Sequence, residues 1–570
     1  MALPENGTPW PPRSIAAAYD RYRFDQAIWL NDTEELGSIL RGGSVNTPEG
    51  RRTQELSRRG GLLVSIMRRW GWARITPDGE KRTDLPMPIG ADIVDLSAAQ
   101  LMSEPPMFRT VKRENDGTAK TDKGPTQQRL DRIATSDDAR MTMHEGAQLA
   151  AALGGVVLKA QWDTGDPDRE SVWFDAVGAD CAIPEFNAAG RLVGVILWQE
   201  YPAPIGQKVL RLLERHAVGV IERALYEGTP QGLGRQVSLD KIETGAALLT
   251  LEGVQLDGLV ATLPTGLDRL TATYWKNRPT RRWRQSGDLA NLGRSDFELI
   301  EPAIDAYSEA WGSLMRDVRL GKARAFVPPG ALERIGGAGQ GAAFDPDREF
   351  YQEVNGLQPD AGTEVIKVEQ PDIRWEAHMR TLAGLKLEIL DAAGWSLSSF
   401  GNPSGVDSAG GGTTATEVVD RTTKSERTRD EKARYFSAAA NPFFRMLLDL
   451  DSKLYPAGGA AKVGELAIDF PDVSQVDPEK QARTFLDLTT AKAISIEQMI
   501  RERKPDWDDD EVALERARIM RDLAESQPAA PDPAQIGRVD PDDPEGGDPD
   551  DPDAPPAPPG AQPEREPVAA

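Results

Sequence analysis

Cysteine and histidine are scarce in this sequence of 570 residues. Cys181 is the one cysteine, and the three histidines are His144, His216 and His378. A single cysteine excludes an intramolecular disulfide and a cysteine-rich metal site. The sequence has no apolar run of about 18 residues, and its first residues carry no charged stretch followed by an apolar one. We therefore expect no membrane span and no signal peptide, and synthesis in a cytoplasm.

Aromatic residues and positive charge are also in short supply. Aromatics make up 6% of the chain, and 67 basic residues stand against 91 acidic ones, giving a formal net charge of −24. A surplus of negative charge opposes tight non-specific binding to DNA, because the phosphate backbone is itself anionic. It does not exclude a protein past which DNA slides, since sliding requires little adhesion.

The last part of the chain is rich in proline and aspartate. From about Gln527 to Ala570 almost no large apolar residue occurs. Such a composition cannot bury enough surface to offset the entropy lost on folding. We interpret it as a disordered acidic tail, and a solvated tail without a partner is the favoured interpretation.

The remaining sequence predicts an α+β fold of several structural units. Helices are expected at Ile89–Met102 and Asp137–Leu153, the second ended by Gly154-Gly155. Between about 156 and 226, alternating apolar and polar residues separated by turn signals predict a meander of antiparallel strands. Near the start, Tyr19, Tyr22 and Trp29 share the spacing of one helix face, which favours a packing face over a ligand site.

From residue 295 onward the pattern becomes mostly helical. Ser295 to Glu298 has capping-box spacing, and apolar residues at intervals of three and four then predict a helix of about 18 residues ending at Gly321. A small β module, Ala323–Val327 with Glu364–Glu369, separates it from a second helix at about 374–391. A glycine-rich stretch at 394–412 precedes a long helix from Thr414 past Pro442 towards Leu454. A strand at 465–470 and helices at about 479–491, 496–502 and 509–524 complete the series.

Motifs that could indicate catalysis each fail at a particular position. The loop Gly337–Gly341 lacks the preceding strand and following helix of a dinucleotide site. Gly321-Lys322 lacks both the earlier glycine and the Ser or Thr of a phosphate-binding loop. His144-Glu145 lacks the second histidine of a zinc-protease helix, and Cys181 fits a small buried residue. The acidic residues form no recognisable dyad, although spacing alone cannot exclude a metal-dependent nuclease. We predict no catalytic, cofactor or metal site.

Two clusters of charge remain to be interpreted. Lys276, Arg278, Arg281, Arg282 and Arg284 are interleaved with aromatic residues, as in a nucleic-acid patch. In so acidic a chain, pairing with carboxylates, within the chain or on another subunit, is favoured over nucleic-acid binding. The mixed-charge segment 420–434 of the long helix is either a solvated face or a set of ion pairs between subunits.

A series of short motifs occurs in a set order along the chain. They are Leu3-Pro4, Trp10-Pro11-Pro12, Pro88 to Ile93, Ser103 to Pro106, Ala152 to Leu158, Leu213 to His216, Ala224 to Tyr226, Leu233-Gly234, Asn277 to Pro279, Gly293 to Asp296, Met315 to Arg324, Thr414 to Glu417 and Pro505 to Trp507. In this order they resemble portal proteins of siphophages of the actinobacteriophage type, the head-to-tail connectors of these viruses. No single motif is decisive, and the resemblance covers about residues 1 to 525.

The resemblance implies an elongated subunit with wing, stem, clip and crown regions. It divides the chain into an N-terminal segment 1–60, wing 61–295, stem helix 296–321, clip 322–372, returning stem helix 373–393, tunnel loop 394–412, long helix and wing return 413–476, crown 477–526 and acidic tail 527–570. The loop Gly336–Gly341 departs from the family pattern by lengthening the clip.

The resemblance also implies roles for particular residues. Residues expected to line a DNA channel are Trp395, Ser398, Ser399, Asn402, Ser404, Asp407, Ser408 and Thr413. Residues expected at contacts between subunits are Arg421, Lys424, Glu426, Arg427, Asp430 and Glu431. Residues expected to dock a partner through the clip are Arg334, Phe344, Phe350 and Tyr351.

As implied function, such a chain forms a ring of about twelve copies at one capsid vertex. Its expected partners are double-stranded DNA passing through the channel, the terminase large subunit, the head–tail adaptor, and the major capsid and scaffolding proteins. The alternatives are another virion structural protein, such as a minor capsid or adaptor component, and an enzyme. Exposed ion pairs contribute only about 0–1 kcal/mol each, so we expect apolar faces to stabilise the ring.

Overall fold

The computed structural model describes residues 3–32, 35–36, 87–113, 119–121, 124–166, 168–202, 208–250, 253–321, 324–326, 367–369, 372–396, 415–456, 465–471, 478–491, 493–504, 507 and 509–526. The chain divides into two compact units, Met1–Gln475 and Val476–Ala570, which are described separately. The predicted acidic tail lies outside the described residues. No helix within these ranges is long and apolar enough to cross a membrane.

Three helices of the first unit pack on one another: α1 (Ala16–Trp29), α5 (Ile89–Met102) and α7 (Asp137–Leu153). The predicted bounds of α5 and α7 are confirmed. Ser136 begins α7 by accepting a hydrogen bond from the amide of Ala139, and Gly154 ends it at a φ of 83°, where a side chain would be strained. Tyr19 of α1 donates to the carbonyl of Ala182 and accepts from Trp198, so this aromatic face is a packing face.

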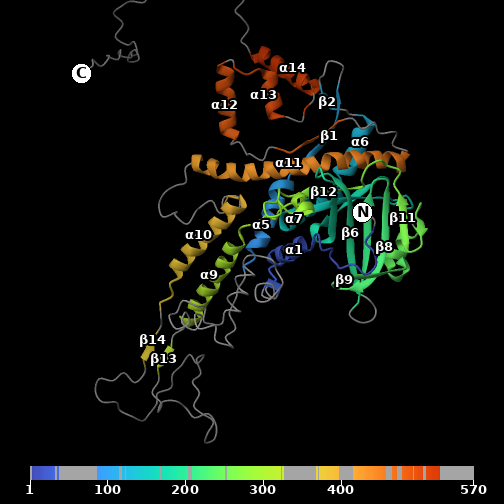
Figure 1. Cartoon of the computed structure of the whole chain (residues 1–570). Coiled ribbons are helices and arrows are strands. Elements are labelled where there is room, and N and C mark those ends of the chain that lie inside the picture. The colour runs from blue at the N-terminus through green and yellow to red at the C-terminus, as the bar shows by residue number, and fades with distance from the viewer. Residues whose placement is uncertain are drawn as a thin grey trace, which may run out of the picture. The chain divides into compact units, whose positions relative to one another are not determined.

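The predicted antiparallel meander is present and confirms the α+β class (Figure 1). Seven strands form the largest sheet, in the order β10-β11-β8-β7-β6-β5 with β9 also paired to β8. Their bounds are β5 (Ala182–Phe186), β6 (Leu192–Pro202), β7 (Val209–Ala217), β8 (Val220–Thr229), β9 (Gly232–Val237), β10 (Gln255–Asp257) and β11 (Val260–Pro264).

Two three-stranded antiparallel sheets complete the α+β part, with orders β12-β3-β4 and β15-β1-β2. The second joins segments far apart in sequence, because β15 pairs Leu466 with Thr110 of β1. The bounds are β1 (Met107–Arg113), β2 (Ala119–Thr121), β3 (Gly155–Gln161), β4 (Trp173–Gly178), β12 (Ala272–Lys276) and β15 (Glu465–Asp469), with α6 (Pro125–Ala134) and α8 (Glu243–Leu248) between strands.

A helix of 40 residues, α11 (Ala415–Leu454), packs across this core. Its aromatic side chains Phe436, Phe443 and Phe444 are at most 2% exposed, and Phe436 meets Trp275 of β12 with ring centroids 4.9 Å apart. Proline interrupts the hydrogen-bond series of a helix, yet α11 continues through Pro442 as predicted. The packing of its apolar face therefore outweighs the local cost of the proline.

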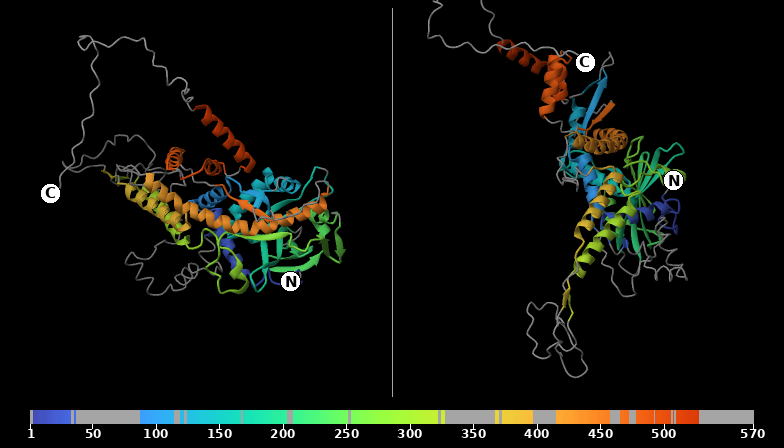
Figure 2. Two further views of the ribbon diagram at one scale, coloured as in Figure 1. Left: turned by 90° about the horizontal axis from the view of Figure 1, so that it is seen from above. Right: turned by 90° about the vertical axis from the view of Figure 1, so that its left-hand side faces the viewer.

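A helical hairpin projects from the first unit in Figures 1 and 2. It consists of α9 (Glu301–Leu320), the paired strands β13 (Arg324–Phe326) and β14 (Lys367–Glu369), and α10 (Trp375–Ala393). The predicted helix, β module and helix are thus present.

The predicted capping box at the start of this hairpin is wrong. The N-cap of α9 is Ile300, with no side-chain cap. Ser295 and Glu298 are buried instead, at 5% and 8% exposed. The local pattern predicted that these two side chains cap a helix, but tertiary packing buries them in the segment before α9.

The described residues of the second unit form three helices, at the predicted places. They are α12 (Pro478–Thr490), α13 (Ile496–Arg503) and α14 (Asp509–Ser526). Ser495 caps α13 by accepting from the amide of Gln498, and Arg516 of α14 forms an ion pair with Glu497.

A buried histidine lies in the largest sheet. His216 is fully buried, with Nδ1 2.7 Å from Thr271 Oγ1 and Nε2 2.8 Å from Glu214 Oε1. Burial lowers the pKa of His216 below its ordinary value, although Glu214 acts in the opposite direction. The folded protein therefore holds a neutral imidazole where the unfolded chain would take up a proton.

We expect acidification to destabilise the protein through His216. Its folded pKa lies below its unfolded value near 6.5, so its stabilising contribution is present above that pH and is lost as the pH falls below it. The thermal midpoint of the native protein should fall more than that of His216→Gln between about pH 7.5 and about pH 5.5. His144→Gln, on α7, is the matched control, and equal slopes for all three proteins would contradict the assignment.

Candidate functional site at the base of the helical hairpin

Three turns from distant parts of the sequence meet just before α9. The amide of Asn277 donates to the carbonyl of Gly154 at 3.0 Å, and the Asn277 side chain donates to the carbonyl of Arg294 at 3.0 Å. A Cβ on Gly293 would lie 1.8 Å from the oxygen of Gly154, so only glycine allows this approach. We call these turns, together with residues 393–396 at the C-terminal end of α10 and residues 425–432 of α11, the junction.

A buried ion pair lies at the centre of the junction. Lys432 of α11 donates to Asp296 and to Ser97 of α5, and the side chains of Lys432 and Asp296 are 2% and 0% exposed. Asn277 donates to the other carboxylate oxygen of Asp296 at 2.9 Å. The junction therefore ties α5, α11 and the segment before α9 together through charged groups away from water.

Burial and mutual attraction together set the pKa values of Lys432 and Asp296. Burial lowers the pKa of Lys432 to about 8, an effect that the attraction of Asp296 only partly offsets. Burial opposes ionisation of Asp296, but Lys432 and Arg278 outweigh it and hold the pKa of that carboxyl below its usual value. At neutral pH both groups are charged and stabilise one another.

The end of α10 is held against α11 by side chains of the junction. Thr428 donates to the carbonyl of Gly394 at 2.8 Å, and Arg278 donates to the carbonyl of Ala393 at 3.4 Å. The amide of Ser396 donates to the hydroxyl of Ser425 at 2.9 Å. The chain is thus fixed up to residue 396, where the described residues stop before α11.

Trp395, expected at the channel, is a core residue in this structure. Its side chain is 1% exposed, and the ammonium of Lys432 lies 5.4 Å from its ring centroid. It is therefore not on a free surface of the chain, because the core of the junction extends two residues beyond the end of α10. The other residues expected at the channel, Ser398, Ser399, Asn402, Ser404, Asp407, Ser408 and Thr413, lie outside the described residues.

Several residues expected at subunit contacts pair within the chain. Lys424 forms an ion pair with Asp391 of α10, Glu431 lies 3.6 Å from Arg278, and Asp430 lies 3.9 Å from Arg429. Arg427 is exposed and Glu426 is half-buried. The side chain of Arg421, and the clip residues Arg334, Phe344, Phe350 and Tyr351, lie outside the described residues.

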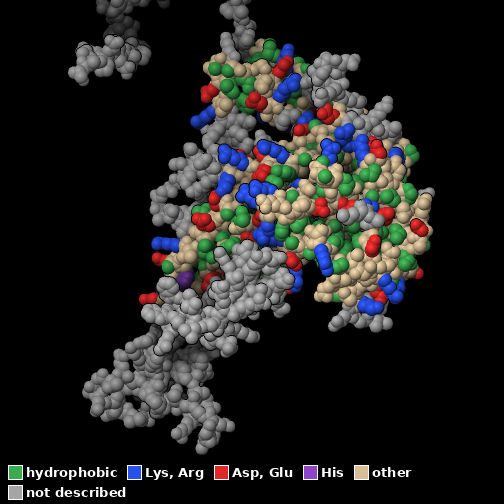
Figure 3. Space-filling view, in the orientation of Figure 1, with side chains coloured by type: hydrophobic (Ala, Val, Ile, Leu, Met, Phe, Trp, Pro, Cys, Tyr) green, Lys and Arg blue, Asp and Glu red, His purple; other side chains and the backbone are tan. Residues whose placement is uncertain are grey.

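The basic cluster after β12 is divided between paired and exposed arginines. Arg278 pairs with Glu431, and Arg282 lies 3.6 Å from Glu301, which also binds Arg21 of α1. Pairing within the chain, the favoured interpretation, is confirmed for these two. Figure 3 shows basic side chains interspersed with acidic ones over α11 and the adjoining end of α10.

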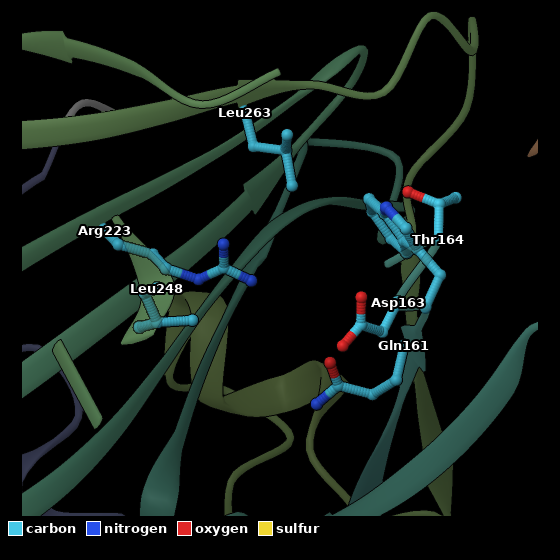
Figure 4. Close-up of a pocket in the computed structure, with 7 residues that line it drawn as sticks. Gln161, Asp163, Thr164, Arg223, Leu248 and Leu263 are labelled. Carbon is cyan, nitrogen blue, oxygen red and sulfur yellow. The ribbon is translucent and has the colours of Figure 1, made fainter. Parts of the chain in front are cut away.

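Two cavities in the described part of the first unit are not lined by Lys432 or Asp296. One of about 350 Å³ lies between the N-terminal segment, β5 and residues 288–292, with Ile15, Ile183 and Leu289 among its apolar lining. Another, of about 50 Å³, has room for little more than water. Figure 4 shows Arg223 of β8 reaching into it opposite Asp163 and Gln161. No group of three or more His, Cys, Asp or Glu side chains suited to a metal ion occurs in the described ranges.

The sequence analysis identified the segments that form the junction, but not the residues that make its hydrogen bonds and its buried ion pair. Asn277, Gly293 and Asp296 lie in two motifs that carried the family resemblance, and Gly154 lies in a third. Lys432 fell within the mixed-charge helix without being distinguished from its neighbours. The spacing of apolar residues on α11 could have marked it, since Lys432 falls between buried Arg429 and Phe436 on the same face.

Comparison with known proteins identifies the class to which this fold belongs. Residues 272–529, from the first residue of β12 to just beyond α14, match the family model for phage portal proteins. Over these residues the chain is similar to that family, in its SPP1 Gp6-like form, so the predicted resemblance to phage portal proteins is confirmed there. The family is structural rather than enzymatic.

Solved structures similar to the chain include components of gene transfer agent particles. One chain from the virion of a native particle is 13% identical, with a TM-score of 0.33, covering 77% of this chain and 98% of that one. One from the neck of an empty particle is 14% identical, with a TM-score of 0.35 and the same coverage. No curated protein matches the chain. The family assignment rests on residues 272–529 alone.

Proposed function

We propose that this chain is the portal subunit of a phage, forming a closed ring at one capsid vertex whose channel passes DNA during packaging and ejection. The observation that carries the proposal is the order of elements within the family-matched region. Helix α9, the paired strands β13 and β14, helix α10, the stretch 397–414 and the long helix α11 follow one another there.

The physical properties of the chain support this proposal. Its net charge of −24 repels the phosphate backbone and so opposes adhesion of DNA. The junction anchors both ends of the hairpin to the core, which lets the hairpin act as a stiff element. We propose that residues 398–413 line the channel, and that the segment between β13 and β14 docks the terminase and later the head–tail adaptor.

The hairpin also carries an apolar face suited to contacts between copies. On α10, Trp375 and Met379, one turn apart, and Leu387, about two turns further, are 59%, 43% and 51% exposed. We call these three residues the α10 stripe. Contiguous exposed apolar surface marks interaction sites, and we propose that these three side chains contribute to such a surface. A neighbouring copy in a ring would cover them.

Images of the purified full-length chain by negative-stain electron microscopy test the proposal. We expect closed rings of about twelve copies with a central hole. A monodisperse monomer at every concentration, alone and with scaffolding protein, would contradict it. Assembly without a central channel would instead favour the second candidate, a minor capsid or adaptor component. ATPase and DNase assays should give background rates, because the sequence predicts no catalytic site.

A further inference from the structure

Leu299, immediately before α9, has a backbone conformation that is unfavourable for leucine. Its φ is 82°, in the left-handed region that residues with a Cβ rarely adopt and that glycine adopts freely. The side chain is 63% exposed, so its own packing does not hold the backbone in this state. Its neighbours do, because Phe297 and Ile300 are at most 1% exposed and the amide of Ile300 donates to the carbonyl of Phe297 at 3.1 Å. The surrounding core therefore imposes a strained conformation at the point where the hairpin begins.

The first residue of α9 is held by a buried group of charges. Glu301 forms ion pairs with Arg21 of α1 and, at 3.6 Å, with Arg282. Arg21 also pairs with Asp25 of α1 at 2.6 Å, and the side chains of Arg21, Asp25 and Glu301 are at most 8% exposed. Solvent screens ion pairs away from water only weakly, so these contacts attach α9 firmly to the rest of the first unit. We call the two ion pairs of Glu301 the clamp.

The hairpin is attached to the first unit at its base. Among the described residues, α9 and α10 pack mainly on each other, and Figure 2 shows them projecting beyond the sheets. The end of α10 is attached at Gly394, which has a φ of 94° and whose carbonyl accepts from Thr428. Residues at the ends of helices are the usual hinges of domain motions, since they absorb changes in φ and ψ. Leu299 and Gly394 occupy these two places at the base of the hairpin.

We propose that the helical hairpin turns as a rigid body about Leu299 and Gly394, and that the clamp holds it in its present orientation against the strain at Leu299. When the clamp opens, Leu299 relaxes to the negative φ that leucine prefers, and the hairpin swings with it. Helix α9 is about 30 Å long, so a turn of about 20° would move β13 and β14 by about 10 Å. The clamp thus sets where this end of the hairpin lies relative to the seven-stranded sheet.

Single-molecule energy transfer between the sheet and the hairpin tests the proposal in the full-length chain. The labels are placed at Arg235→Cys on β9 and Arg380→Cys on α10, both exposed positions, with Cys181→Ser to remove the natural cysteine. A small labelled fraction is mixed with unlabelled chain, so that an assembly carries one labelled copy. The parent chain should then show one narrow population of transfer efficiencies.

The first variant, Glu301→Ala, opens the clamp and should produce a second population. It leaves Arg21 paired with Asp25, so neither of these buried charges loses its partner. Measurement at pH 7.5 keeps Asp25 ionised, since burial raises its pKa to about 6. Asp317→Ala is the matched control, because it removes the contacts of Asp317 with α10 near the opposite end of α9. It should keep the single population of the parent chain.

The second variant adds Leu299→Gly to Glu301→Ala and tests the hinge. Glycine is not strained at a positive φ, so the present orientation becomes favourable again and the second population should shrink roughly tenfold. Leu299→Ala in the same background is the matched control. It removes the exposed side chain but keeps the Cβ that causes the strain, so the second population should remain.

Each other outcome contradicts a part of the proposal. A single population in Glu301→Ala, or an equal second population in Asp317→Ala, would overturn the clamp. A second population that Leu299→Gly leaves unchanged, or that Leu299→Ala reduces as much, would overturn the hinge. Should Glu301→Ala melt early in circular dichroism, Glu301→Gln serves, with the second population expected and its absence overturning the clamp. The labelled chain reports on its own hairpin, so failure to form rings would contradict the proposed function alone.

Discussion

Replacing Lys432 with methionine is expected to lower the free energy of unfolding by about 3–5 kcal/mol. Asp296, whose side chain is 0% exposed, would remain in the core without its cation. Its hydrogen bond from Asn277 does not replace the lost charge. Urea-induced unfolding at one protein concentration, followed by circular dichroism, measures the effect.

A matched control lies two turns earlier on the same helix. Lys424 pairs with Asp391, but these side chains are 44% and 66% exposed, so Lys424→Met should cost only about 0–1 kcal/mol. The double variant Lys432→Met with Asp296→Asn should recover part of the loss, since the uncompensated charge is removed. If Lys432→Met is no less stable than Lys424→Met, the junction is not held by its buried pair.

Placing glutamate at all three positions of the α10 stripe, Trp375, Met379 and Leu387, is expected to abolish ring assembly. Each side chain is about half exposed, so covering it contributes about half of the 1.5–3 kcal/mol for full burial, or roughly 2–4 kcal/mol for three per interface. The added negative charges act in the same direction. Because the loss recurs at every interface, we expect monomers by mass photometry at concentrations where the native chain forms rings.

The seven-stranded sheet offers a control for this variant. Val218, Leu256 and Leu259 are 57%, 61% and 40% exposed in the first unit, outside the hairpin. Their replacement by glutamate adds the same charge and removes comparable apolar surface, and it should leave ring assembly unchanged. Equal loss of assembly in both triple variants would show that added charge, not the α10 stripe, is responsible.

Much of the secondary structure could be predicted because its signals are local. Asp137–Leu153 has a serine before its first turn and a glycine after its last, and both predicted ends are confirmed. Alternating apolar residues in β6 to β8 predicted the meander for the same reason, since each strand buries one face. The order of helix, β module and helix was likewise readable, and it supported the family resemblance that residues 272–529 confirm.

The residues of the candidate site were harder to predict from local sequence patterns. Trp395 looked like part of a polar, glycine-rich loop, yet it packs in the core, because Lys432 and Thr428 from α11 lie around the end of α10. Ser295 and Glu298 matched a capping box, but packing buries them before the helix begins. In each case a contact with a distant segment outweighed a local preference.

The sequence alone determined many of the longer helices and strands of this protein, that the chain is acidic, and that familiar catalytic motifs are absent. Those properties depend on spacing, composition and neighbouring residues. Only the tertiary structure brought Gly154, Asn277, Asp296 and Lys432 together, and separated the paired Arg278 from the exposed Arg281. The pairing of buried charges and the close approach of two glycine backbones depend on residues more than 130 positions apart, and no local pattern encodes which distant groups will meet.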